Sequence, residues 1–435
     1  MPLIRIVALQ AKTYYRARRT VEEVMPVARA ALDDIVDALT RPASAEERNP
    51  KPQAEEAPPR TIKVTAPNHE LAVEKVNELF LENRWADGLP VVPPTEEAVK
   101  RMLAGTSRSP DEVIGAVAPK SGRATIEKIA INAVMAGAKP EYLPVIIAAM
   151  EGFTDKDYNL THVQASTGSF IPAIIVTGPI AKELDFNSGL GFLGHGHQAN
   201  STVGRALRLC LLNLGHTWPA VNDMALIGRV SSYTFYTFAE NQDMSPWEPY
   251  HVSLGYKPED STVTVSTVYQ AFTVLGGGAV RLWTAQEILD RIVPNAVEGG
   301  SVSNQKVLLV LHPDCAAELA QMGYTRKKLQ DWIYEQARIP YARLDPNRIK
   351  TLQKMIEDGA VPKDSVPAFR EALREGGKVP VFLSAGDIHI FVAGGSPGYS
   401  LFFHYDFPAH QTRKVWGATL TKAGQEVIQR NAKEV

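Results

Sequence analysis

The chain has 435 residues, which is enough for two or three domains with substantial hydrophobic cores. Its formal net charge of −2 gives no basic field for nucleic acid, and no apolar run approaches the length of a membrane span. The two cysteines, Cys210 and Cys315, cannot form a disulfide framework. Because the N-terminus also lacks the order of a secretory signal, we expect a cytoplasmic protein that binds neither nucleic acid nor a membrane.

The N-terminal segment is predicted to be a small arm on a linker. Residues 2–9 have the apolar character of a strand, and residues 20–40 have the spacing of an amphipathic helix. Residues 42–60 contain five prolines and four glutamates, which predicts a flexible, solvated linker. Residues 1–41 are too few to fold alone, so we expect this arm to dock on the body or on a neighbouring subunit of a homo-oligomer.

The body that follows alternates predicted helices with predicted strands, which indicates an α/β fold. We expect a main lobe at residues 61–300, which carries a glycine-rich loop, and a second lobe at residues 301–435. The predicted strands are residues 171–180, 233–238, 261–277, 306–313, 379–385 and 388–395. The predicted helices include residues 69–85, 125–137, 141–152, 315–323 and 326–337.

The most unusual stretch is GLGFLGHGHQANSTVGRALRL, residues 189–209. Asn200, Ser201 and Thr202 are all favourable N-cap residues, so a helix is expected to begin among them. Glycines let backbone amides converge, and a helix N-terminus attracts negative charge. Arg205, which lies inside this helix, could then hold a carboxylate or phosphate through two hydrogen bonds. The stretch therefore predicts a cradle for a small anion.

Two other interpretations of this stretch stay open. The glycines can simply form a tight turn, while Arg205 and Arg208 pair with carboxylates inside the protein. The spacing fits no nucleotide-binding fingerprint. His195 and His197 could instead hold a divalent metal with a third ligand from elsewhere, although histidines of an exposed loop are often not ligands.

Acid–base residues are expected in FAENQDMSPWEPYHVSLGY, residues 238–256. A glutamate held against Trp247 in a dry site would have a raised pKa and could transfer a proton, and Glu240 and Glu248 are the candidates for this role. His251 could share this role because its ordinary pKa is near neutrality, and Asn241 could contact the substrate. Alternatively, Glu240 and Glu248 are the internal partners of Arg205 and Arg208.

Three further positions are candidates. Cys315 follows a predicted strand at the start of a helix, where Asp314 is the expected cap, but no base adjoins it. Asp87 lies in a Gly-Pro turn, where it can cap its own backbone or face a pocket. Gly394 and Gly395 follow the last predicted strand, so they could form a second wall of a ligand site.

Several long motifs resemble the large bacterial proteins described as UGSC-related or UGSC-like. The matching stretches are NRWADGLPVVPPTEEAV, TIEKIAINAVMAGAKPEYLPV, LGHGHQANSTVGRALRL, ENQDMSPWEPYHV and LHPDCAAELAQMGYTRKKLQDWIYEQARIP. The similarity covers residues 70–398, and residues 20–42 look like the closing helix of the small UGSC domain. The positions that the resemblance marks as worth carrying over are Asn200, Thr202, Arg205, Glu240, Asn241, Trp247, Glu248 and His251.

The resemblance implies no settled activity. The family's label refers to a selenocysteine- or cysteine-containing U-G-S-C motif, and no Cys-Gly-Ser-Cys occurs in this chain. This departure speaks against thiol or selenol redox chemistry.

Three functions are consistent with these residues. The first is an enzyme of the lyase, hydratase or hydrolase type, which acts by acid–base chemistry on a small carboxylate-bearing molecule without a required cofactor. In it, Arg205 and the helix amides hold the anion, and Glu240, Glu248 or His251 moves the proton. The second is a metal-dependent hydrolase or lyase that uses His195 and His197. The third is a non-catalytic assembly or partner subunit tethered by its arm.

Overall fold

The computed structural model describes residues 20–48, 61–219, 221–274, 284–298, 306–395, 400–405 and 410–415. The chain divides into two compact units, Met1–Thr65 and Ala66–Val435. The predicted strand at residues 2–9 and most of the linker lie outside the described residues, as does the expected seam between lobes near residues 299–303.

The first unit contains three helices, α2 (Val21–Ala30), α3 (Leu32–Thr40) and α4 (Ala45–Arg48), among its described residues. The prediction of one continuous helix over residues 20–40 is corrected here, because a turn at Ala31 separates α2 from α3. No glycine or proline marks that break, so periodicity alone cannot find it. The predicted linker begins with α4, whose start is closed by reciprocal hydrogen bonds between Ser44 and Glu47.

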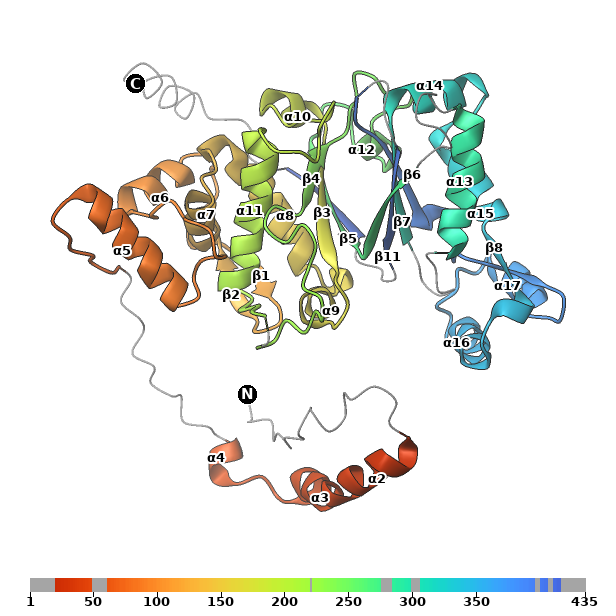
Figure 1. The fold of residues 1–435 in the computed structure, drawn as a ribbon, viewed down its shortest axis with the longest axis horizontal. Coiled ribbons are helices and arrows are strands. Elements are labelled where there is room, and N and C mark those ends of the chain that lie inside the picture. Colours follow the sequence, from red (N-terminus) through yellow and green to blue (C-terminus); the bar gives the residue numbers. More distant parts are fainter. Residues whose placement is uncertain are drawn as a thin grey trace. The chain divides into compact units, whose positions relative to one another are not determined.

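The second unit is built around two mixed sheets of four strands each (Figure 1). In the first sheet the strand order is β12-β5-β3-β4, and β3 runs parallel to β4 but antiparallel to β5. In the second sheet the order is β10-β7-β11-β6, with β10 parallel to β7. The bounds are β3 (Ile171–Thr177), β4 (Tyr236–Ala239), β5 (Thr262–Val268), β6 (Gln270–Val274), β7 (Lys306–Leu311), β10 (Ile388–Val392), β11 (Ser400–Tyr405) and β12 (His410–Lys414).

The two sheets face each other, and helices cover their outer faces. On β3, Ile174 and Val176 join the core beneath the helices, whereas Ala173 and Ile175 join a smaller core with Leu308 and its neighbours from the second sheet. Alternate side chains of a strand point to opposite faces, so this division defines four layers, helix, sheet, sheet and helix. The α/β fold expected from the sequence is confirmed.

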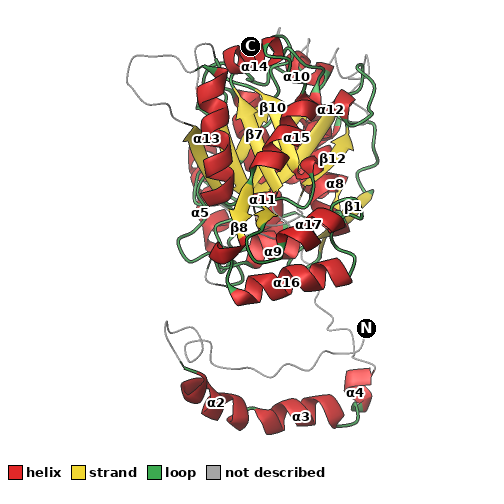
Figure 2. Cartoon of the chain, turned by 90° about the vertical axis from the view of Figure 1, so that its right-hand side faces the viewer, coloured by secondary structure: helices red, strands yellow, loops and turns green. Residues whose placement is uncertain are grey.

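The first sheet is covered by α7, α8 and α11, and the second by α13, α14 and α15 (Figures 1 and 2). Thr125 caps α7 as predicted, because its side chain accepts a hydrogen bond from the amide of Lys128. The longer helices are α5 (His69–Glu82), α6 (Glu96–Leu103), α7 (Ile126–Met135), α8 (Leu143–Thr154), α11 (Gln198–Asn213), α13 (Ala285–Glu298), α14 (Pro313–Gln321), α15 (Arg326–Gln336) and α16 (Pro346–Glu357).

Short elements complete the second unit. The helical segments are α9 (Leu160–Ala165), α10 (Pro179–Glu183), α12 (Tyr250–Ser253), α17 (Val366–Ala372), and four 3-10 turns, η1 (Pro140–Tyr142), η2 (Lys156–Tyr158), η3 (Tyr341–Arg343) and η4 (Ala385–Asp387). The small strand pairs are β1 (Val113–Val117) with β2 (Gly122–Thr125) and β8 (Arg338–Pro340) with β9 (Lys378–Pro380).

The sheets do not separate at the boundary predicted near residue 300. Strand β6 precedes that boundary but pairs with β11 in the second sheet. Strand β12 follows it but pairs with β5 in the first sheet. The two halves of the body therefore exchange one edge strand each, and the contacts group residues 66–435 as one unit.

Candidate functional site

The N-terminus of α11 is the point to which the glycine-rich loop leads. The helix begins at Gln198, with His197 as its N-cap, so the expectation of a start among Asn200, Ser201 and Thr202 is corrected. These three residues lie in the first helical turn instead. The half-buried Ser201 donates its amide to the carbonyl of His197, and Thr202 donates its hydroxyl to that of Gln198.

Asn200 holds the loop in place. Its side-chain oxygen accepts the amide of Asn187 at 2.9 Å, and its side-chain nitrogen donates to the carbonyls of Asn187, Phe192 and Thr237. A buried amide with this many partners is satisfied by the protein. Asn200 therefore positions the loop and has no spare hydrogen-bonding capacity for a ligand.

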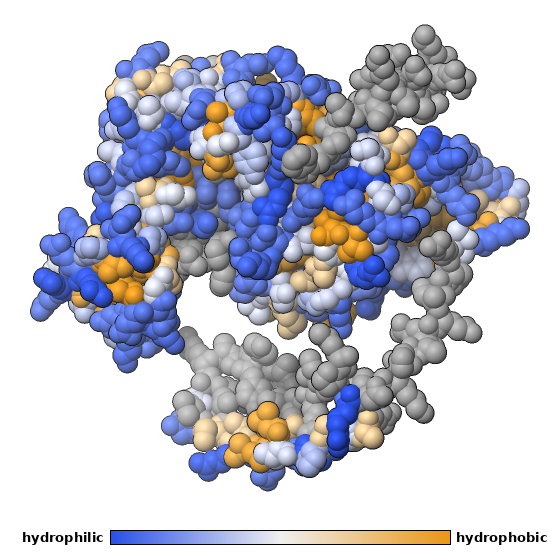
Figure 3. All heavy atoms as spheres, turned by 180° about the vertical axis from the view of Figure 1, so that it is seen from behind, coloured by the Kyte–Doolittle hydropathy of each residue, from blue (hydrophilic) through white to orange (hydrophobic). Residues whose placement is uncertain are grey.

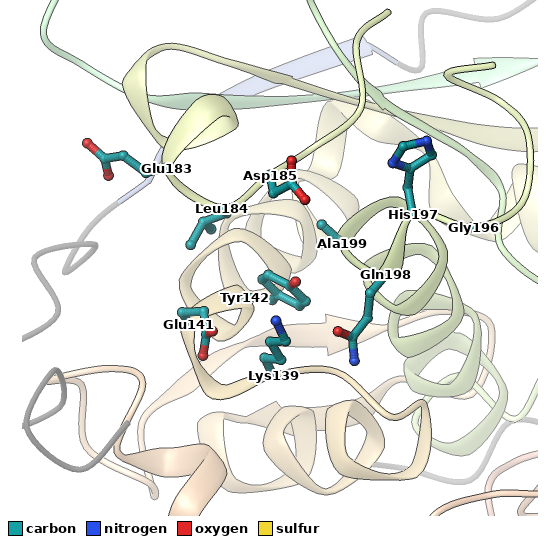
Figure 4. A pocket seen from close by; sticks show the side chains of 10 residues that line it. All are labelled: Lys139, Glu141, Tyr142, Glu183, Leu184, Asp185, Gly196, His197, Gln198 and Ala199. Carbon is teal, nitrogen blue, oxygen red and sulfur yellow. The ribbon is translucent and has the colours of Figure 1, made fainter. Parts of the chain in front are cut away.

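The helix terminus itself is left open. Within the described part of the chain, no side chain caps α11, and the amide groups of Gln198, Ala199 and Asn200 have no hydrogen-bond partner. A cavity of about 260 Å³ lies at this terminus (Figure 4). It is lined by Lys139, Glu141, Tyr142, Glu183, Leu184, Asp185, Gly196, His197, Gln198 and Ala199. Pockets for drug-sized ligands span about 300–1,000 Å³, so this cavity suits a smaller molecule.

Tyr142 lies at the centre of the cavity, between Lys139 and Asp185 (Figure 4). Only 3% of the residue is exposed, and its ring packs at 6.1 Å from that of Phe186. Among the described residues its hydroxyl has no hydrogen-bond partner, and it is not one of the fully buried side-chain atoms, so it opens onto the cavity. Burial, followed by the negative charges of Glu141 and Asp185, raises the pKa of Tyr142 to about 12.

The charges around the cavity are mixed. The Nζ atom of Lys139 lies 6.0 Å from the centroid of the Tyr142 ring. Three carboxylates, from Glu141, Glu183 and Asp185, line the cavity with it. Asp185 has a φ of 56°, in the left-handed region that aspartate tolerates better than most residues. Lys139 therefore shares the lining with three carboxylates, of which that of Glu183 points away from the other labelled side chains in Figure 4.

The two candidate metal ligands differ in position. His197 lines the cavity and is half-buried, whereas His195 is exposed on the loop and is not part of the lining. In the described ranges, no group of three or more His, Cys, Asp or Glu side chains is arranged to hold a metal ion. The third ligand that the metal interpretation needs is thus not found there.

Arg205 does not face the cavity. Its guanidinium forms two hydrogen bonds of 2.9 Å with the carboxylate of Asp87, and it also donates to the carbonyls of Leu89 and Pro90. Only 3% of the Asp87 side chain is exposed. A guanidinium held in this way has few N–H groups left to bind a ligand, because its Nε and Nη2 groups already donate to Asp87. The residue joins α11 to the turn that follows α5.

Arg208 is buried on the same helix. Its Nε donates to the carbonyl of Ser232 at 2.8 Å, and its guanidinium lies 4.7 Å from the centroid of the Phe235 ring. Neither arginine pairs with Glu240 or Glu248, so the alternative that names these glutamates as their partners is corrected. Arg205 pairs with Asp87 instead because the turn at Asp87 folds back over α11.

Glu240 is bound to Arg326, the first residue of α15. The distance from Glu240 Oε1 to the Arg326 guanidinium is 3.0 Å, and Glu240 Oε2 accepts the amide of Tyr250 at 2.7 Å. Arg326 also donates to the carbonyls of Glu248 and Ile390. Burial raises the pKa of Glu240 to about 7 even though the charge of Arg326 and the hydrogen bond from Tyr250 lower it. These bonds join β4, α12, β10 and α15.

The other candidates of residues 238–256 lie around this ion pair. The Glu248 side chain is exposed, and the indole of Trp247 donates to the carbonyl of Tyr324 at 2.9 Å. His251 is fully buried, and this burial lowers its pKa. The amide of Asn241 donates to the carbonyl of Val392, and its side chain accepts the amide of Met244. None of these residues lines the cavity at α11.

The start of the glycine-rich loop, at Asn187 and Ser188, is hydrogen-bonded through its backbone to the segments at Ala239 and Gly394. The amide of Ala239 donates to the carbonyl of Asn187, and that of Gly394 donates to the carbonyl of Ser188. A Cβ atom on Gly395 would lie 2.9 Å from the side chain of Leu190, so this glycine allows the loops to approach closely. Gly394 and Gly395 therefore pack on the glycine-rich loop and do not line the cavity. The loops are neighbours, yet this cavity does not extend to the Trp247 segment.

Between the sheets lies a second buried polar cluster. The hydroxyl of Tyr250 is 2.7 Å from His389 Nδ1 and 3.2 Å from His410 Nε2. The two imidazoles stack with centroids 3.6 Å apart and an interplanar angle of 7°. Burial lowers the pKa of His410 to about 3 and that of His389 well below its ordinary value. Both rings are therefore neutral at pH 7.

Cys315 is buried in α14, and this burial raises the pKa of its thiol to about 12. The expectation that Asp314 caps the helix is corrected, because the N-cap is His312, whose ring accepts the amide of Cys315. An imidazole at the position before a proline can reach that amide as an aspartate would. The thiol has none of the character of an activated nucleophile.

Of the ten lining residues only His197 is among the candidates from the sequence, and the most important omissions are Lys139, Tyr142 and Asp185. Lys139 lies just before η1, Tyr142 lies in η1, and Asp185 follows α10, so only the fold brings them to α11. The motif AGAKPEYLPV contains the first two, and its charged and aromatic residues between two apolar helices were a signal that could have been used. Asp185 had no such signal.

Fold and site together define an α/β protein with two facing sheets and a small, charged cavity at a helix N-terminus. The chain matches no protein-family model, no curated protein and no solved structure. The likeness to UGSC-related proteins therefore stays an expectation from the motifs. Across the described segments, every helix is too short or too polar to cross a bilayer.

Proposed function

We propose that the chain is an enzyme that performs acid–base chemistry on a small carboxylate-bearing molecule bound at the N-terminus of α11. One observation carries this proposal. The open amides of Gln198 and Ala199 and the hydroxyl of Tyr142, which have no partner among the described residues, meet at one cavity. Donors that open onto a cavity without a protein partner are available to a bound anion.

The amides and Lys139 supply the hold on the carboxylate. A helix N-terminus carries a partial positive charge of about half an elementary unit, which favours an anion placed on its axis. Lys139 adds a full positive charge from the opposite side of the cavity (Figure 4). Arg205 has no part in this hold, because Asp87 already occupies its guanidinium.

Asp185 and Tyr142 are the pair that would move protons. Asp185 is exposed to the cavity and can accept a proton, while the raised pKa of Tyr142 keeps its hydroxyl protonated and able to donate. In a lyase or hydratase, the carboxylate would take a proton from the carbon next to the substrate carboxylate, and the phenol would protonate a leaving hydroxyl, which departs as water. In a hydrolase, the carboxylate would deprotonate the attacking water.

This assignment moves the acid–base role away from Glu240, Glu248 and His251. The carboxylate of Glu240 is fully buried against Arg326, and His251 is equally enclosed. A group that transfers a proton to a substrate must reach it directly or through one water. We therefore give Glu240 and His251 a structural role and leave the exposed Glu248 without one.

The experiment is calorimetric titration of the full chain with propionate and other small monocarboxylates. Binding that Lys139→Met and Tyr142→Phe each weaken about tenfold, while Lys156→Met leaves it unchanged, is the expected result. Lys156 is an exposed lysine outside the cavity lining, so it is a matched control for loss of charge. Binding that all three variants retain would place the anion elsewhere and overturn the proposal.

An assembly role for the arm is a second candidate, and one observation favours it. Leu32, Val36 and Leu39 are spaced to lie on one side of α3, and their exposed fractions are 53%, 47% and 79%. Figure 3 shows apolar surface on the helices of this first unit. An apolar stripe at this spacing normally packs against another chain element. We propose that it supports a homo-oligomer. Size-exclusion with light scattering on Leu32→Asp/Leu39→Asp would detect this as a loss of mass per particle, and an unchanged mass would contradict it.

A further inference from the structure

The charge around the α11 cavity restricts which carboxylates can bind there. Glu141, Glu183 and Asp185 line it with three negative charges, and Lys139 supplies one positive charge. A dicarboxylate would bring two more negative charges to a cavity that already has an excess of two. Like charges at short range oppose binding, and they do so more strongly where a neighbour such as Tyr142 is buried.

Two of these carboxylates lie near the atoms that would hold the ligand. Burial is the main cause of the raised pKa of Tyr142, and the negative charges of Glu141 and Asp185 raise it further. Figure 4 shows Asp185 on the side of the cavity facing Tyr142 and close to Ala199, in the first turn of α11. A molecule whose carboxylate contacts the helix amides would therefore present its neighbouring atoms to Asp185.

We propose that the substrate of this site is an amino acid or a related molecule that carries both a carboxylate and an ammonium group. The inference rests on the proposed function and adds the second recognition element to it. The carboxylate binds the open amides of Gln198 and Ala199 with Lys139 and the Tyr142 hydroxyl. The ammonium group binds one oxygen of Asp185, whose other oxygen remains free to accept a proton, and Glu141 adds to the attraction at the rim.

The geometry of the cavity supports this pairing over simple anion binding. A cavity of about 260 Å³ can hold an amino acid but leaves little room for a larger ligand. Its two kinds of polar group are arranged on different elements, with the amides on α11 and the carboxylate of Asp185 on the segment after α10. A molecule with two opposite charges on adjacent carbons satisfies both, whereas a plain carboxylate satisfies only one.

The test compares ligands that share a carbon skeleton and differ by one amino group. Calorimetric titration of the full chain at pH 7.5 and low salt would use aspartate with succinate, alanine with propionate, and glutamate with glutarate. In at least one pair the amino acid is expected to bind about tenfold more tightly than its partner. Asp185→Asn is expected to reduce that ratio to near one, whereas Asp157→Asn, which removes an exposed carboxylate outside the cavity lining, leaves it intact.

Each outcome separates this inference from the proposed function. Equal binding within every pair, or tighter binding of the plain carboxylates, would overturn the inference. The proposed function would survive that result if Lys139→Met and Tyr142→Phe still weakened binding. A preference for amino acids that persists in Asp185→Asn would overturn the assignment of the ammonium site. Absence of binding in all six titrations would overturn both.

Discussion

The cavity at α11 and the ion pair of Glu240 with Arg326 lie on neighbouring parts of the second unit, yet they treat polar groups in opposite ways. At the ion pair each guanidinium nitrogen of Arg326 has an acceptor, and the side chains of Glu240 and Arg326 are enclosed, with exposed fractions of 0% and 6%. At α11 the amides of the first turn and the Tyr142 hydroxyl have no partners among the described residues. Satisfied polar groups hold the fold, and unsatisfied ones beside a cavity are available to a ligand.

The comparison also explains Arg205. This arginine lies on the same helix as the open amides, but its guanidinium donates two hydrogen bonds to the carboxylate of Asp87. Charge in a sequence therefore does not identify a ligand site until the partners of each charge are known. The loop and the helix are recognisable from residues 189–209, whereas the partners belong to other elements.

The largest effect is expected at the buried ion pair. Glu240→Ala would leave the Arg326 guanidinium buried without its carboxylate, which should lower the free energy of unfolding by about 3–5 kcal/mol. Urea denaturation monitored by circular dichroism measures this change. Glu248→Ala, which removes an exposed carboxylate of the same segment, is the control and should change stability by less than about 0.5 kcal/mol. A similar small effect for Glu240→Ala would contradict the structural role given to it.

A smaller loss is expected at Arg205. Arg205→Met removes charge-assisted hydrogen bonds to a nearly buried Asp87, so it should cost about 2–3 kcal/mol of unfolding free energy. The dissociation constant for the cavity ligand should stay within about twofold of the wild-type value, because Arg205 does not face the cavity. Denaturation and calorimetry on the same sample separate the two quantities. Weakened ligand binding with unchanged stability would restore Arg205 to the anion site.

The imidazole pair between the sheets predicts a dependence on pH. His410 has a folded pKa of about 3, below its ordinary value, so the unfolded chain binds a proton that the folded chain does not. The neutral His410 therefore costs the folded protein no stability above about pH 6.5. As the pH falls from about 6.5 toward 3, protonation of the unfolded chain lowers the free energy of unfolding by about 1.4 kcal/mol per pH unit. His389 acts in the same direction.

The measurement is the slope of stability between pH 6.5 and 5 in wild type and in His410→Asn. The raised pKa of Glu240 gives an opposite slope over part of this range, but it is common to both proteins and cancels in the difference. The variant should lose stability less steeply as the pH falls. Equal slopes would mean that the imidazole of His410 is protonated in the folded protein.

The smallest effect is expected for Tyr142→Phe in the absence of ligand. Its hydroxyl has no partner in the described chain, so removing it should change the free energy of unfolding by less than about 0.5 kcal/mol. Tyr158→Phe is the matched contrast, because the hydroxyl of Tyr158 donates to the carbonyl of Ser266 and accepts from Thr267. That variant should cost about 1–2 kcal/mol. Equal losses in both variants would show that Tyr142 has an internal partner.

Much of the fold follows from the sequence because local patterns determine it. Strands β3, β7 and β10 are continuous apolar runs since both of their faces are buried, and such runs are easily recognised. The order of strands is different, because pairing between distant segments leaves no local pattern. The exchange of β6 and β12 between the sheets could not be predicted for this reason.

The candidate site was only half predictable. Residues 189–209 indicate an anion site through their glycines and the helix start, and the cavity does lie at that helix start. The residues that complete the cavity could not be selected from the sequence. Lys139, Tyr142 and Asp185 line it only because η1 and the segment after α10 pack against α11. Conversely, Glu240 has the raised pKa expected of a catalytic acid, but burial against Arg326 produces it.

The most direct test of the account is an amide chemical-shift titration of the isotope-labelled full chain with aspartate. The account predicts saturable shifts at the amides of Gln198 and Ala199, since these donors would bind the ligand carboxylate. The amides of Asn241 and His251 should change little. Shifts confined to the latter pair, with the first turn of α11 unaffected, would contradict the claim that the open helix terminus is the binding site.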